Sequence, residues 1–273
     1  MRVKHFVMGR GVHVLSALAF LVLFAGAASG ALQQDETVTI HVSDARPLAS
    51  AIKELEDRYG WVITYEDPRY VDASDVEDVT WRRKDLDFTK KVLAPRGGPF
   101  SFRYPVPAGV DAPDASALLG KLLEEYHRTG YPGVFRLART GSVFHIVPSA
   151  SRNTLGQLEP WSSPLNARIS IANNERTAFD MLEAIAAAVS RSGSVKVGVA
   201  SAPLNLVMGV RVQGGARNER ARSVLLRTLE AAMQTLEATN QRLSWTLLCV
   251  PVGTWPEPVC GLNVHFVGSR VER

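Results

Sequence analysis

The sequence predicts an α+β protein built from two tandem β-α-β-β-α-β-β modules, each a small mixed sheet packed with two helices. The first observation is an apolar helix pattern that occurs twice, about 130 residues apart. Its members are Leu48, Ala51, Ile52, Leu55 and Tyr59 in the first copy and Ala178, Met181, Leu182, Ile185 and Val189 in the second. The second observation is a similar final strand, at residues 143–149 and again at 263–269. The modules are therefore expected at residues 32–149 and 167–273, joined by a Ser-, Pro- and Asn-rich linker at 150–166.

The first module is expected to begin with a strand, because apolar residues alternate over positions 38–42. A helix follows, begun by Asp44 or its neighbour and ended by Gly60. Further strands are expected at 61–65, 100–104, 134–138 and 143–147. A second helix, capped by Asp111 or Asp114, carries the apolar face Ala115, Leu118, Leu119, Leu122, Leu123 and Tyr126. Residues 68–95 form a charged, irregular insertion for which no element is predicted.

The second module repeats this order. Ile169 and Ile171 indicate its first strand, and Asn174 is the candidate N-cap of a helix over residues 177–190. Its other strands are expected at 195–199, 207–212, 243–250 and 262–267. Its second helix carries the apolar face Ala221, Val224, Leu225, Leu229 and Ala232.

The only two cysteines of the chain, Cys249 and Cys260, lie on either side of a turn-rich stretch between two predicted strands. This placement predicts a disulfide that joins the two strands of a hairpin. The alternative is a pair of reduced thiols at neighbouring strand ends.

The first 31 residues are expected to be a signal peptide. Arg2, Lys4 and Arg10 precede a largely apolar run, and small residues suited to cleavage follow it. The alternative is an uncleaved membrane anchor, since residues 12–28 are only slightly short for a membrane span. No later segment is apolar enough to span a bilayer, so the mature protein is expected to be periplasmic or secreted.

Removing the leader also changes the net charge. It holds 3 of the 31 basic residues and none of the 27 acidic ones, which leaves 28 basic residues and a net charge of +1. A nearly neutral chain gives no electrostatic reason to expect binding to nucleic acid or to an anionic membrane surface.

Residues 40–55 and 59–65 resemble the short N-terminal domain shared by secretins and TonB-dependent receptors. That family shows a strand, a polar turn, a Pro-Leu-x-x-Ala-Leu helix, a glycine and a second strand. Here Pro47 and Leu48 open the helix, Ile52 stands where the family usually has Leu, and Gly60 ends it. The resemblance implies a small periplasmic α/β module that binds other proteins and has no catalytic residues.

One enzymatic motif can be weighed against this interpretation. Ser50 and Lys53 form the S-x-x-K of penicillin-binding proteins and serine β-lactamases, and residues 151–153 resemble their S-x-N element. These enzymes then need a Lys-Thr-Gly element on a later strand. The nearest matches, Arg-Thr-Gly at Arg128 and Arg139, come before residue 151, so the order is wrong. We expect Ser50 to be an ordinary helix residue and the protein to be non-enzymatic.

Metal and anion sites are not expected, and no cofactor is predicted. The acidic cluster of the insertion lacks the D-x-D-x-D-G spacing of a calcium loop; its members are Asp72, Asp75, Glu77 and Asp78. The histidines expected in the mature chain lack close ligand spacing; they are His41, His127, His145 and His265. The glycine pairs 97–98 and 214–215 are expected in turns, the second with a capped helix start. Trp161 and Trp255 are expected to be exposed, as docking anchors or loop plugs.

These observations together favour an exported, non-enzymatic protein-protein interaction or scaffold module of the bacterial cell envelope. Its expected partners are envelope proteins, through strand addition at an exposed sheet edge. The alternative is a periplasmic small-molecule or glycan-binding protein that holds its ligand between the two modules. A hydrolase of unrecognised type is the third hypothesis.

Overall fold

The computed structural model describes residues 36–82, 91–193, 195–234, 241–254 and 257–268. The predicted leader and Trp255 lie outside these residues. The described part is a mixed α+β structure, as predicted. Its first half contains β1 (Glu36–Asp44), α1 (Pro47–Tyr59), β2 (Ile63–Glu66), β3 (Val76–Asp78), β4 (Leu93–Pro95), β5 (Gly98–Val106), α2 (Ala115–Arg128), β6 (Val134–Thr140), β7 (Val143–Arg152) and β8 (Leu158–Pro160). The second half contains β9 (Arg168–Thr177), α3 (Ala178–Ser192), β10 (Lys196–Ser201), α4 (Leu204–Val207), β11 (Arg211–Arg220), α5 (Ala221–Gln234), β12 (Arg242–Cys249) and β13 (Val259–Val267).

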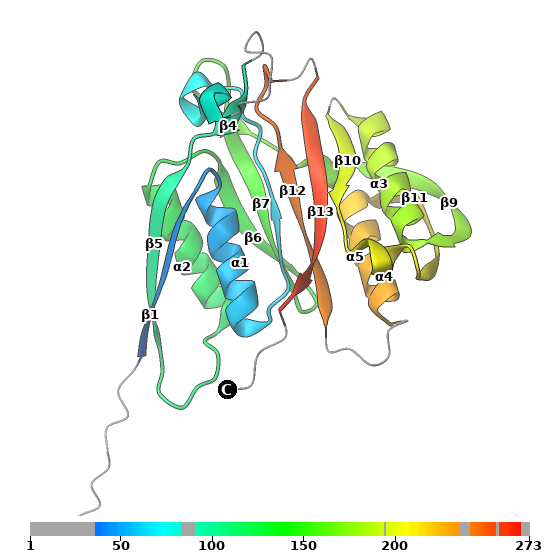
Figure 1. Ribbon diagram of the computed structural model, residues 1–273, viewed down its shortest axis with the longest axis horizontal. Helices are drawn as coiled ribbons and strands as arrows, with labels where there is room; N and C mark the ends of the chain where they lie inside the picture. The colour runs from blue at the N-terminus through cyan, green and yellow to red at the C-terminus, as the bar shows by residue number, and fades with distance from the viewer. Residues whose placement is uncertain (1–35, 83–90, 194, 235–240, 255–256, 269–273) are drawn as a thin grey trace, which may run out of the picture. The chain divides into compact units, whose positions relative to one another are not determined.

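One central sheet takes strands from both halves, in the order β10-β13-β12-β2-β7-β6 (Figure 1). The prediction of two modules, each with its own mixed sheet, is therefore not confirmed. The two halves join where β12 pairs with β2 in parallel, Thr246 beside Tyr65 and Leu247 beside Glu66. This pairing fills the edge that a separate first-half sheet would have left open at β2.

Each half also contains a two-stranded antiparallel ribbon outside the central sheet. β1 pairs with β5 along its whole length, from Glu36 opposite Val106 to Asp44 opposite Gly98. β9 pairs with β11 in the second half, with two irregularities in the register. In each half, the helices pack between the ribbon and the central sheet. Residues of the ribbon, the helices and the sheet together form one hydrophobic cluster in each half.

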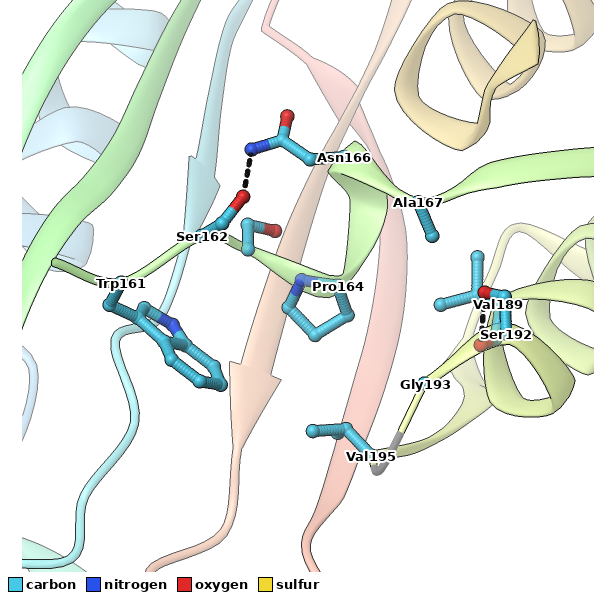
Figure 2. A pocket seen from close by; sticks show the side chains of 10 residues that line it. Trp161, Ser162, Pro164, Asn166, Ala167, Val189, Ser192, Gly193 and Val195 are labelled. Atoms are coloured by element: carbon cyan, nitrogen blue, oxygen red, sulfur yellow. Dashed lines mark hydrogen bonds between the residues drawn. The ribbon is translucent and has the colours of Figure 1, made fainter. Parts of the chain in front are cut away.

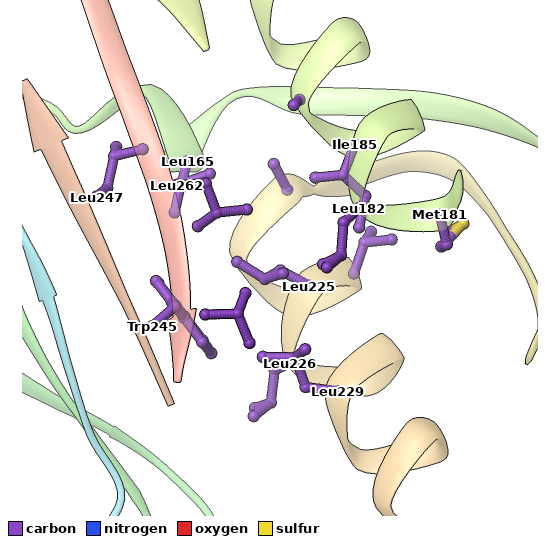
Figure 3. Packing of buried hydrophobic residues seen from close by; sticks show 14 of the residues in the cluster. Leu165, Met181, Leu182, Ile185, Leu225, Leu226, Leu229, Trp245, Leu247 and Leu262 are labelled. Carbon is purple, nitrogen blue, oxygen red and sulfur yellow. The ribbon is translucent and has the colours of Figure 1, made fainter. Parts of the chain in front are cut away.

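The two pairs of helices lie on opposite faces of the central sheet. Tyr65 packs with α1 and α2, whereas Leu247 packs with α3 and α5. Tyr65 is paired with Thr246, and Leu247 with Glu66, so Tyr65 and Leu247 point to opposite faces because side chains alternate along a strand. Figure 3 shows Trp245, Leu247 and Leu262 of the sheet pointing toward the side chains of α3 and α5.

The helix starts differ from prediction at two of three sites. Asp114 caps α2 as expected, and its side chain accepts a hydrogen bond from the Ala117 amide at 2.6 Å. Asp44 instead accepts from the Arg46 amide in the preceding turn, and α1 begins at Pro47. The predicted cap Asn174 is paired with Gly214 inside the β9–β11 ribbon, and Thr177 caps α3. Pairing in the ribbon therefore moves the cap from Asn174 to Thr177, whereas the helix predicted over residues 177–190 is observed at Ala178–Ser192.

Both segments without predicted elements contain secondary structure within their described residues. The insertion contains two 3₁₀ turns and the short β3–β4 pair. In the segment 150–166, predicted as a linker, β7 continues to Arg152, and β8 pairs back onto it. A 3₁₀ turn then places Leu165, fully buried, in the core of the second half. The described residues belong to one compact unit.

Candidate functional site

The central sheet ends at β6 on one side and at β10 on the other. No other strand of the described residues pairs with the outer edge of either. On β6, Arg136, Arg139 and Thr140 are exposed, and Leu137 and Ala138 are half-buried. An edge strand carries backbone N–H and C=O groups without a strand partner, which another extended chain can pair with. Side chains already bond two of these positions, His127 at Phe135 of β6 and Ser190 at Val197 of β10. Charged residues such as these arginines limit unselective pairing at such an edge.

The second edge, β10, carries mostly small side chains. Gly198, Ala200 and Ser201 are exposed there, and only Lys196 is charged. The short helix α4 follows, and it exposes Leu204 and Met208. These two residues lie one helical turn apart, so they form an apolar surface next to the end of β10. The strand predicted at 207–212 is observed only from Arg211, and α4 occupies Leu204–Val207 before it, because a helix of one turn has no apolar period from which it can be predicted.

At the internal junction, Arg222 of α5 binds Glu66 of β2 with two hydrogen bonds, at 2.7 and 2.8 Å. Glu66 is fully buried, and Asn166 accepts a further hydrogen bond from the same guanidinium. Arg222 therefore joins three separate elements around β2. A buried carboxylate needs such a partner because an unpaired charge in the interior is very costly.

The residue after Glu66 forms a second polar centre at the same junction. Asp67 is fully buried and accepts four hydrogen bonds, all between 2.7 and 2.9 Å. The donors are the Arg46 guanidinium, the Tyr65 and Tyr70 hydroxyls and the Cys249 amide. Burial, followed by the charge of Asp67, raises the pKa of both tyrosines well above the usual value, so both stay protonated donors. This junction was not predicted, since nothing in the sequence pairs residue 66 with residue 222.

The two cysteine sulfurs lie 2.00 Å apart, at disulfide distance, as the sequence predicted. Cys249 and Cys260 are direct neighbours across the β12–β13 hairpin. Because Cys249 also donates its amide to Asp67, the hairpin end is tied to the junction as well.

We expect reduction of this pair to lower the free energy of unfolding by about 3 kcal/mol, the loss for a loop of this length. Urea unfolding of the oxidised protein with and without reductant measures the difference. The double variant Cys249→Ala/Cys260→Ala is the control and should not respond to reductant. Equal stability of the wild type in both conditions would show that the bridge contributes nothing.

His145 and His265, the histidines of the corresponding strands, each contact the other half of the chain. The His145 ring lies 5.7 Å from that of Trp245, centroid to centroid, and Nδ1 is 2.8 Å from the Thr64 hydroxyl. His265 lies 2.9 Å from the buried Glu56 of α1. Neither belongs to a group that could hold a metal ion in the described part of the chain. Both histidines therefore act as packing and hydrogen-bonding residues between the halves.

Burial, and secondarily the positive charge of Arg222, lowers the pKa of His145 to about 4. The unfolded chain binds a proton near pH 6.5 while the folded chain does not, so stability falls as the pH drops from 6.5 toward 4. The expected loss between pH 7 and pH 5 is about 2 kcal/mol. His145→Gln should remove that part of the pH dependence in urea unfolding. His41→Gln, at an exposed position, is the matched control, and identical pH profiles for all three proteins would contradict the assignment.

The remaining candidates of the sequence analysis have local partners. Lys53 pairs with Asp57 one turn further along α1, rather than with Ser50. In the acidic cluster, Asp72 accepts from Ser74, Asp75 from Arg152 and Asp78 from Thr80. The pair Gly214–Gly215, predicted in a turn, lies in β11, where a side chain at Gly215 would collide with the backbone of Asn173. Close approach of the two ribbon strands therefore requires this glycine.

A pocket of about 370 Å³ lies beside Trp161, between the segment after β8 and the end of α3 (Figure 2). Trp161 is half-buried, rather than exposed as predicted, and packs against the Arg69 guanidinium at 5.0 Å. The hydroxyls of Ser162, Ser163 and Ser192 already make local hydrogen bonds. Ser162 and Ser163 accept these bonds through Oγ, whereas Ser192 donates its hydroxyl to the Val189 carbonyl.

A second pocket of about 340 Å³ is lined from both halves of the chain. Its apolar lining residues are Val62, Val143, Leu226, Leu229, Met233 and Leu243. The volume is near the lower limit of small-molecule sites. The alternative hypothesis places a ligand between the two halves, and this groove, which is lined from both, lies at that position.

No helix within the described residues is long and apolar enough to cross a membrane. Comparison with protein-family models, with curated proteins and with solved structures finds no match for this chain.

Proposed function

We propose that this protein is an exported, non-enzymatic interaction module of the bacterial cell envelope that binds another polypeptide at the outer edges of its central sheet. The observation that carries the proposal is the pair of edge strands, β6 and β10, whose outer sides have no neighbouring strand among the described residues. Strand addition at such an edge supplies backbone hydrogen bonds, and the side chains of the edge select the partner.

The predicted export and the two-module origin belong to this proposal. The cysteine pair at disulfide distance supports an oxidising compartment outside the cytoplasm. The element order supports a duplicated unit. When the insertion and α4 are left out, both halves contain the order strand, helix, strand, strand, helix, strand, strand. The shared sheet is then a product of two units joined edge to edge.

Site-specific photo-crosslinking tests the proposal. A photoreactive residue is placed at Ala138 of β6 or Ala200 of β10 in the full chain, and irradiation is carried out in intact cells. We expect both edges, or one of them, to crosslink to a polypeptide. A photoreactive residue at Ser223, an exposed position of α5 over the middle of the sheet, is the matched control and should not crosslink. Crosslinks of equal yield from Ser223, or none from either edge, would contradict the proposal.

The groove shared by the two halves carries the second candidate function, a small-molecule or glycan-binding protein. Its apolar lining favours an apolar or amphipathic ligand over a free sugar. A thermal-shift screen tests it, because a ligand that binds only the folded protein raises the melting temperature. Leu226→Arg should abolish any such shift, whereas the edge substitutions should leave it unchanged.

A further inference from the structure

We infer that the polypeptide bound at β6 is a second copy of this chain, whose β10 pairs with β6 in parallel and extends the central sheet from head to tail. This inference rests on the proposed function, since it names the partner of the same two edges. The starting point is the internal junction, which shows one such pairing already made within the molecule.

β6 and β10 hold the positions that β12 and β2 hold at the junction. In each half, the strand after the first helix pairs in parallel with the last strand, β2 with β7 and β10 with β13. In each half, the last strand then pairs antiparallel with the strand after the second helix, β7 with β6 and β13 with β12. The junction joins the strand after the second helix of the second half, β12, to the strand after the first helix of the first half, β2. The two strand types that meet inside the molecule are thus the two left at its outer edges.

The strand directions also match. β2, β7 and β12 run one way through the sheet, and β6, β13 and β10 run the opposite way. β6 and β10 therefore point in the same direction within one molecule. If a second copy is shifted sideways across the strands without rotation, its β10 lies beside β6 and parallel to it. This is the same relation that β12 has to β2.

The placement of the helices allows this contact. The helices of the two halves alternate between the two faces of the sheet, so the copy would place α3 and α5 on the face opposite α1 and α2. This is the same alternation that the internal junction shows, and the helices of neighbouring units do not compete for one face. The small exposed side chains of β10 permit close approach of another strand.

The side chains also set the strength of the contact. At the junction, Arg222 is the second residue of α5 and binds Glu66. The second residue of α2 is the uncharged Ser116, so this ion pair has no counterpart at the outer edge. Arg136 and Arg139 add positive charge to β6. We therefore expect a weaker, concentration-dependent association.

Because the two edges differ, the contact is heterologous and does not close with two copies, but continues into a ring or a filament.

Sedimentation velocity of the purified protein, expressed from its full chain, tests the inference up to about 1 mM, a range that includes millimolar dissociation constants. Three single variants are compared, each with an added charge: Ala138→Lys on β6, Ala200→Lys on β10 and Ser223→Lys on α5 as control. We expect the wild type and the control to form species that grow beyond a dimer as concentration rises. Each edge variant alone should stay monomeric, because every contact needs both edges. An equal mixture of the two edge variants should form dimers and stop there.

Two results would overturn the inference. One is a wild type that stays monomeric over the whole range, and the other is an edge variant that still dimerises alone, which would show a contact between like edges. Thermal unfolding of each variant shows whether it has folded, and Ala138→Arg and Ala200→Arg replace any variant that has not. If the wild type is monomeric but β6 crosslinks to a different polypeptide in cells, the inference fails and the proposed function stands. If the wild type is monomeric and neither β6 nor β10 crosslinks to any polypeptide in cells, both fail.

Discussion

Replacing Arg222 by Met is expected to lower the free energy of unfolding by about 3–5 kcal/mol, the range for removal of one partner from a buried ion pair. Glu66 is fully buried, and both of its carboxylate oxygens accept hydrogen bonds from this guanidinium. Methionine keeps most of the side-chain volume, so the loss reports the unpaired carboxylate rather than a cavity. Urea unfolding at neutral pH measures it.

The double variant Glu66→Leu/Arg222→Met is the matched comparison. It removes both charges, so it should be considerably more stable than Arg222→Met alone, because no charge is left unpaired. Arg128→Met is the exposed control, since its pairing with Glu125 lies on the surface of α2, and it should change stability by less than about 1 kcal/mol. Equal stability of Arg222→Met and Arg128→Met would contradict the role assigned to Arg222.

The second large effect is expected for Asp67→Ala, a loss of at least about 3 kcal/mol, the lower bound for three buried donors left without an acceptor. The substitution leaves two buried tyrosine hydroxyls and the buried Cys249 amide without their acceptor, and each such loss costs about 1–3 kcal/mol. It also leaves the half-buried Arg46 without its carboxylate. Because Asp67 joins the end of β2 to β12, the loss should act on both halves together.

Thermal unfolding followed by calorimetry measures this effect, with Asp57→Ala as control at an exposed surface pair. Asp57→Ala should change stability by no more than about 1 kcal/mol. We expect Asp67→Ala to retain a single transition at a lower temperature, since the sheet is shared. Two separate transitions would show that the halves unfold independently and that Asp67 does not couple them.

Much of the local structure could be predicted because it depends on local periodicity. The faces of α1, α2, α3 and α5 follow the apolar residues identified in the sequence, and most of these residues are buried. The alternating strands at 38–42 and 100–104 are present, and they pair with each other over their whole length. The cysteine pair could be predicted from two strands and the turn between them, a separation of 11 residues.

The arrangement of the sheet could not be predicted in the same way. Pairing of β12 with β2 brings together residues about 180 positions apart, and strand patterns do not specify which strands become neighbours. Glu66 and Asp67 stand at the end of a strand, where a charged residue usually reaches solvent. The parallel neighbour β12, the start of α5 and the donors Arg46 and Tyr70 turn that position into the buried junction, and none of these contacts can be predicted from local sequence pattern.

The helix start at Asn174 shows a related limit. Asn, Glu and Arg at 174–176 have the composition of a turn and helix cap, but backbone pairing with β11 holds them in a strand. A neighbouring strand therefore overrides the local preference, and the cap moves from Asn174 to Thr177, while the helix itself begins at Ala178, one residue from its predicted start. The edges β6 and β10 could not be predicted either, since an edge is defined by the absence of a neighbour in the assembled sheet.

Hydrogen-deuterium exchange of the protein alone and bound to the polypeptide captured at its edges tests the central claim most directly. In the dilute protein, amides of β2 and β12 should exchange slowly, because these strands pair on both sides. Outward-facing amides of β6 and β10 should exchange quickly, except those of Phe135 and Val197, which donate to His127 and Ser190. On binding, we expect protection to appear in β6, in β10 or in both. Protection confined to the groove lined by Val62, Leu226 and Met233 would contradict binding by strand addition and favour the ligand-binding function.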